Sequence, residues 1–180
     1  MLDRRRLAIV AKVIGVLAIA VVLQVFVVSQ VSVLGVTADL FLVLTTVVAV
    51  TRGPLEGAVF GFMAGLVADT AYLAPLGVRS LVYVIVGYLA GLAAARLAFS
   101  SPWGVALLAG AASFGAQFVF GLFEFVMGPR AAFLRMLGTQ MLPEALLDGL
   151  LTAPIYVLLV RLHLLPPASS EPSGPGGGKT

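Results

Sequence analysis

The chain has 180 residues, of which 61% are hydrophobic and 11% charged; its net charge is +3 and its mean hydropathy +1.11. Water-soluble domains carry about 25% charged residues, and one of this length could not bury so much apolar surface. The composition therefore excludes a soluble protein and predicts a chain that lies in lipid, while the absence of cysteine excludes disulfides and thiolate metal sites.

Apolar runs long enough to cross a bilayer recur along the chain, since about 20 residues, each rising about 1.5 Å, span the hydrocarbon core. The first run follows the basic start MLDRRR and is too long for a signal-peptide core, so we expect a retained first helix. The second is short and crosses only if the preceding residues contribute. The predicted spans are approximately 7–29, 39–51, 54–73, 80–99, 104–127 and 140–162.

The lysine and arginine residues indicate the orientation of these spans. With six alternating helices and a cytoplasmic N-terminus, eight basic residues face the cytoplasm and three face outward, namely Arg79, Arg130 and Arg135. This bias favours cytoplasmic termini, and a five-span arrangement ranks second because it moves two more basic residues outside. Residues 1–165 are thus predicted to form an all-α polytopic membrane domain. The Pro/Gly/Ser-rich residues 166–180 are predicted to form a disordered cytoplasmic tail.

Most acidic residues fall toward the outer half of the membrane in this arrangement. An ionised side chain within a bilayer is costly unless it is paired or hydrated, which favours a polar cluster or a shallow vestibule. The alternative is that these side chains are solvated one by one near helix ends. The residues of this predicted outer polar cluster are Asp39, Asp69, Arg79, Glu144 and Asp148, and Glu124 falls in the same zone.

The stretch RGPLEGAVFGFMAGLVAD carries a glycine at every fourth position. Four residues advance a helix by about 400°, so glycines at this spacing form a nearly continuous groove that winds slowly around it. Such a groove can pack against another helix of the same chain or against a partner membrane protein. The glycines are Gly53, Gly57, Gly61 and Gly65, with Gly87 and Gly91 repeating the spacing in the next predicted span.

The predicted cytoplasmic turn before this stretch carries two opposite charges. Arg52 and Glu56 are four residues apart, so they lie on one helical face and can form an ion pair. The alternative assigns them separate roles, with Arg52 as an anchor at the membrane surface and Glu56 as an acid near the positive end of a helix.

Side chains able to catalyse a reaction are scarce. The single histidine, His163, stands at the inner end of the last predicted span, and the sequence contains neither a transition-metal cluster nor a phosphate-binding loop. Asp39 and Asp69 fall at similar predicted depth and could share a proton, as in intramembrane aspartyl proteases. However, the glycine-x-glycine-aspartate motif of those proteases is absent. We therefore predict no enzymatic activity, no cofactor and no bound metal.

Several motifs occur in a characteristic order along the chain. They are Asp39-Leu40, Arg52-Gly53-Pro54, the glycine-stepped stretch from Gly57 to Asp69, Leu76-Gly77, Gly87-Tyr88-Leu89-Ala90-Gly91, and the final LPEALLDGLLTAPIYVLLVRL. In this order they resemble the bacterial rod shape-determining protein MreD family, over about residues 1–165. One departure is Thr37-Ala38, which stands where the family typically has a proline before the second span.

The resemblance implies a subunit of the cell-elongation machinery in the bacterial inner membrane. Such proteins associate with MreC and, through it, with the actin-like MreB, the glycosyltransferase RodA and a class B penicillin-binding protein. The resemblance also implies a six-helix bundle similar to the S-components of energy-coupling-factor vitamin transporters.

The leading prediction is therefore a non-enzymatic scaffold of lateral peptidoglycan synthesis. Its small-residue grooves would accept the MreC transmembrane helix, and its outer polar cluster would meet periplasmic parts of the complex. We also expect contact with membrane lipid and none with nucleic acid. The alternative is an S-component-like transporter subunit that binds a small molecule or a lipid at the outer polar cluster.

Overall fold

The computed structural model of the chain describes residues 15, 18–22, 24, 35–71, 77–97, 101–127 and 137–168. The regular secondary structure of these residues is helical. The helices are α2 (Leu40–Arg52), α3 (Pro54–Ala71), α4 (Val78–Leu97), α5 (Pro102–Met127), the π-helical turn η3 (Leu137–Met141) and α7 (Leu142–Arg161).

Three stretches of the described chain are long and apolar enough to cross a membrane. They are Val78–Leu97, Pro102–Phe123 and Leu137–Arg161, and α2 is a shorter apolar helix. The first predicted span lies mostly outside the described residues, as do Arg130, Arg135 and the tail beyond Ala168. A total of six spans therefore remains a prediction from the sequence.

The helix ends differ by a few residues from the predicted ones, for local reasons. Helix α5 begins two residues before the predicted start because Ser101 Oγ accepts a hydrogen bond from the Gly104 N–H at 3.1 Å. Pro102 fits the first turn that follows, where its missing N–H is not needed. Near the other end, the Ala168 N–H donates to the Tyr156 hydroxyl at 3.0 Å, so the first residues of the predicted tail return to α7.

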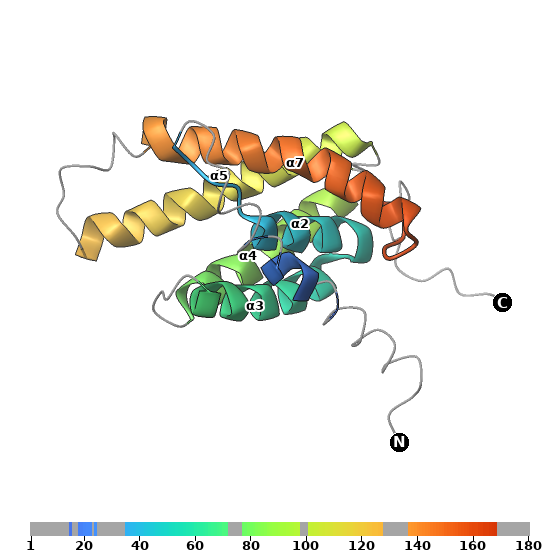
Figure 1. The fold of residues 1–180 in the computed structure, drawn as a ribbon, viewed down its shortest axis with the longest axis horizontal. Helices are drawn as coiled ribbons and strands as arrows, with labels where there is room; N and C mark the ends of the chain where they lie inside the picture. The colour runs from blue at the N-terminus through green and yellow to red at the C-terminus, as the bar shows by residue number, and fades with distance from the viewer. Residues whose placement is uncertain are drawn as a thin grey trace, which may run out of the picture.

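Helix α2 lies in the middle of the bundle, between the α3–α4 pair and the α5–α7 pair (Figure 1). Eleven of its 13 residues are buried, as expected for a helix that is apolar all round. The hydroxyl groups of its two central threonines, Thr45 and Thr46, donate hydrogen bonds to the carbonyl oxygens of Phe41 and Leu42, respectively. The α2 helix can therefore pass through the core without exposing a polar group.

The outer faces of the other helices are strongly apolar. Leu55 of α3 and Leu146 of α7 are each 73% exposed, and Leu107 of α5 is 69% exposed. In water, contiguous apolar surface of this kind marks an interaction site, whereas lipid tails solvate it readily. The pattern agrees with the composition, since the helices around α2 expose large apolar side chains that lipid can solvate.

Candidate functional site

The α3–α4 contact is built on glycine. A Cβ added at Gly57, Gly61 or Gly65 would come within 3.0 Å of backbone atoms of α4. At Gly61, for example, it would lie 2.7 Å from the Tyr83 carbonyl carbon. Gly87 makes the reciprocal contact, because a Cβ added at this position would lie 2.6 Å from the carbonyl carbon of Gly57. The two antiparallel backbones thus touch directly, and this face of α3 is occupied within the chain.

The two remaining glycines of the predicted groove act at the turn between α2 and α3. Gly91 of α4 packs on this turn, where a Cβ would meet the Pro54 Cα at 2.5 Å. Gly53 is the C-cap of α2, with φ +102°, a backbone conformation that favours glycine. Gly53 therefore forms the turn, and the groove of α3 itself consists of three glycines because this helix begins at Pro54.

Asp39 is the N-cap of α2 and connects this helix to α4. Its Oδ1 accepts hydrogen bonds from the N–H groups of Phe41 and Leu42 at 3.0 and 3.2 Å. Its Oδ2 accepts from the Arg79 guanidinium at 3.3 Å and from the Tyr83 hydroxyl. Since Asp39 is only 4% exposed, its carboxylate depends on these donors in place of water.

Asp148 of α7 connects the same point to the other helix pair. Its Oδ1 accepts the backbone N–H of Asp39 at 2.8 Å, and its Oδ2 accepts the Ser113 hydroxyl of α5 at 2.5 Å. Asp148 and Ser113 are both buried. A single chain of hydrogen bonds therefore runs from α4 through the start of α2 to α7 and α5.

Further polar side chains satisfy groups around this connection. The buried Gln24 donates to the Ala38 carbonyl and accepts from the Leu40 N–H, each at 2.9 Å. Glu144 of α7 accepts a hydrogen bond from Gln117 of α5. These side chains fix the segment that leads into α2 and add a second polar link between α5 and α7.

Asp69 has a different task from the other acids of the outer polar cluster. Its carboxylate accepts the N–H groups of Gly77 at 2.7 Å and of Arg79 at 3.2 Å, and the residue is fully buried. It thereby caps the start of α4 from the end of α3. No hydrogen bond joins Asp69 to Asp39 within the described residues, so these two carboxylates do not form the pair that an aspartyl protease requires.

The structure thus joins four predicted cluster residues, because Arg79 contacts Asp39 through its guanidinium and Asp69 through its backbone N–H, and Asp148 accepts the Asp39 N–H. The fifth, Glu144, contacts Gln117. The uncharged partners of these residues, Tyr83, Ser113 and Gln117, were not predicted from the sequence. The signal that could have found them is helical spacing, because Tyr83 lies four residues after Arg79, and Gln117 four after Ser113. Four-residue spacing places each pair on one face of its helix.

Chemically, this arrangement serves to join helices. Each of the carboxylates of Asp39, Asp69 and Asp148 accepts at least two hydrogen bonds from within the chain. Among the described residues, no group of three or more histidine, cysteine or acidic side chains could hold a metal ion. The hydrogen bonds to these carboxylates also disfavour the alternative in which the acidic residues of the outer polar cluster present open negative charges to a small molecule.

The chain was compared with known protein families, with curated proteins and with solved structures. The model of the family described as rod shape-determining protein MreD matches residues 4–163. The chain belongs to the MreD family. Neither a curated protein nor a solved structure matches it. Family membership, together with the three apolar helices of membrane-spanning length, establishes a membrane protein of rod-shape determination.

In this member of the MreD family, several of the motifs that carried the resemblance lie at helix junctions. Asp39 begins α2, Gly53 ends it, and Pro54 begins α3. Asp69 and Gly77, which has φ +101°, together form the start of α4. The motif residues therefore define how the MreD helices meet.

The ion pair predicted from the four-residue spacing of Arg52 and Glu56 is formed. Arg52 and Glu56 lie 3.3 Å apart, with their side chains 25% and 57% exposed. An exposed pair of this kind stabilises a protein by only about 0–1 kcal/mol. It therefore contributes far less to the bundle than the buried polar links.

Two buried serines of the MreD bundle allow a matched test of the polar links. We expect Ser113→Ala to destabilise the protein by about 1–3 kcal/mol, because it removes a donor from the buried Asp148 carboxylate. Ser80→Ala should be neutral or slightly stabilising, since the buried Ser80 hydroxyl has no hydrogen-bond partner among the described residues. Unfolding by denaturing detergent, followed by circular dichroism, measures both changes. Equal losses of stability in the two variants would contradict the hydrogen bond assigned between Ser113 and Asp148.

Proposed function

We propose that the chain is a non-enzymatic scaffold of the bacterial cell-elongation complex, spanning the inner membrane six times in an S-component-like bundle with both termini in the cytoplasm. It binds the transmembrane helix of MreC and, through MreC, meets MreB, RodA and a class B penicillin-binding protein during lateral peptidoglycan synthesis. The observation that carries this proposal is the family match over residues 4–163.

The chemistry of the described residues supports a scaffold. Buried carboxylates accept hydrogen bonds from other helices of the chain, and the glycine face of α3 is covered by α4. What the bundle offers a partner is therefore its outward apolar surface. Helices associate in lipid through close packing of such surfaces, without a hydrophobic driving force.

The proposal is tested by photo-crosslinking from each outer face. A small photo-reactive side chain is placed singly at Leu55 in α3, Leu81 in α4, Leu107 in α5 and Leu146 in α7, all of them more than half exposed. We expect an adduct with co-expressed MreC from at least one helix face, because a bound single-span helix must lie against one of these surfaces.

The matched control is the same side chain at Leu42, which is 1% exposed in the first turn of α2. It should give no adduct with MreC, because its neighbours all belong to the chain itself. Folded protein that gives no MreC adduct from any of the four outer positions would refute direct binding in the membrane.

A further inference from the structure

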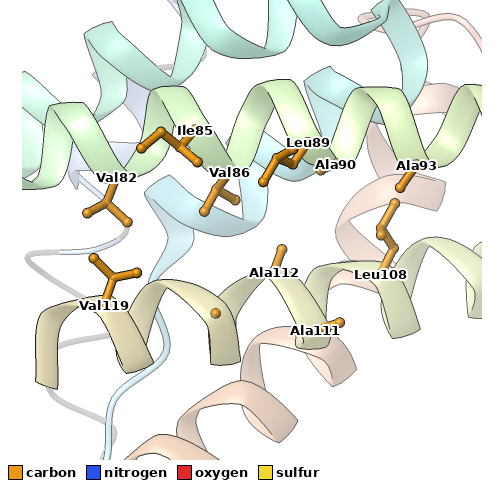
Figure 2. Close-up of a pocket in the computed structure, with 11 residues that line it drawn as sticks. Val82, Ile85, Val86, Leu89, Ala90, Ala93, Leu108, Ala111, Ala112 and Val119 are labelled. Atoms are coloured by element: carbon orange, nitrogen blue, oxygen red, sulfur yellow. The ribbon is translucent and has the colours of Figure 1, made fainter. Parts of the chain in front are cut away.

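An apolar groove runs between α4 and α5. Figure 2 shows Val82 of α4 facing Val119 of α5 at one end, and Ala93 near Leu108 at the other. The groove has a volume of about 420 Å³ and is lined by apolar side chains and by Gly115. Its walls belong to the two helix pairs on either side of α2, which are in closer contact within each pair than across the groove.

The dimensions of the groove select its occupant. Eleven residues separate Val82 from Ala93, so the groove is roughly 16 Å long at the helical rise per residue. A volume of about 420 Å³ over this length is too small to enclose a helix, which with its side chains has a diameter of about 10–12 Å. An extended hydrocarbon chain fits this space, and the body of a helix does not.

The positively charged side chain of Arg79 lies near the Val82–Val119 end of the groove. Arg79 lies one turn before Val82, and its guanidinium carbon is 5.1 Å from the centre of the Phe120 ring, next to Val119. Arg79 thus reaches from α4 to α5 across this end. In its ion pair with Asp39, the arginine side chain is 27% exposed and the aspartate only 6%. The more accessible member of this pair is therefore the cation, and a guanidinium is complementary to a phosphate.

From these observations we propose that the groove and Arg79 form a binding site for one anionic phospholipid. An acyl chain lies between α4 and α5, and the headgroup phosphate meets the guanidinium at the Val82–Val119 end. This site is independent of MreC binding, so either proposal can fail without the other.

The test is native mass spectrometry of the protein released from micelles containing equal amounts of phosphatidylglycerol and phosphatidylcholine. Wild-type protein should retain one phosphatidylglycerol in preference to phosphatidylcholine. Gly115→Leu should lose this lipid, because it fills the groove. No atom lies within 4 Å of a Cβ at position 115, so the variant has room to fold. Leu107→Phe, which adds bulk to an exposed position outside the groove in the same helix, should retain the lipid.

The headgroup contact is tested at Arg79 itself. Arg79→Gln should lose the preference for phosphatidylglycerol, and Arg79→Lys, which keeps the positive charge, should restore most of it. Equal retention of both lipids by wild-type protein, or an unchanged phosphatidylglycerol adduct in Gly115→Leu, would overturn the proposal. The proposal would also be overturned if Gly115→Leu kept the lipid and lost the binding of MreC. That result would show that a side chain of the partner occupies the groove.

Discussion

Gly61→Leu is expected to separate α3 from α4 and to destabilise the protein by about 3 kcal/mol or more. Overpacking a core typically costs about 1–3 kcal/mol when neighbouring side chains can move aside. At Gly61 the obstacle is the backbone of Tyr83, which cannot move without displacing the whole of α4. The free energy of unfolding, measured by titration with denaturing detergent, should report this loss.

Gly115→Leu is the matched control for this substitution. It introduces the same side chain in place of a glycine inside α5, where no atom lies within 4 Å of an added Cβ. Its stability should stay close to that of the wild type. If both variants were equally stable, the direct backbone contact of α3 with α4 would be wrong.

Removing the carboxylate of Asp39 is the second change with a large expected effect. Breaking one partner of a buried ion pair costs about 3–5 kcal/mol, because the other charge is left uncompensated. In Asp39→Ala, Arg79 and Tyr83 lose their shared acceptor, and the first turn of α2 loses its cap. We therefore expect a loss of about 3–5 kcal/mol in the same unfolding measurement.

The exposed Arg52–Glu56 pair provides the comparison for Asp39. The nitrogen-to-oxygen distance is 3.3 Å in both Arg79–Asp39 and Arg52–Glu56, so the two pairs differ chiefly in burial. Glu56→Ala should change the free energy of unfolding by less than about 1 kcal/mol, since water replaces the lost partner. A similar loss for Glu56→Ala and Asp39→Ala would show that burial of Asp39 does not determine its contribution.

These two expectations describe how the bundle is held together. Glycine contacts join α3 to α4, and a chain of polar contacts connects α4, α2, α7 and α5 at the start of α2. A scaffold needs fixed relations among its helices, because partners recognise the arrangement of its outer faces. In the MreD family, we expect substitutions at these joints to affect partner binding through folding, with no direct contact to the partner.

The sequence by itself determined the lipid environment, the approximate limits of the described helices and the family. These features depend on local properties, namely apolar runs of membrane-spanning length and the proline, glycine and aspartate residues at helix ends. It also indicated a zone where acidic and basic residues meet, because charges inside a membrane must be compensated.

Only the tertiary structure decided which group each of these residues meets. Asp39 and Asp148 are separated by 109 positions, and no spacing rule shows that one accepts the backbone N–H of the other. From the sequence, the glycine groove could pack against an internal helix, which was favoured at most positions, or against a partner. The close approach of α4 assigned the groove of α3 to the chain itself. The physical reason is that helical periodicity identifies a face, whereas the neighbour of that face depends on how all the helices pack together.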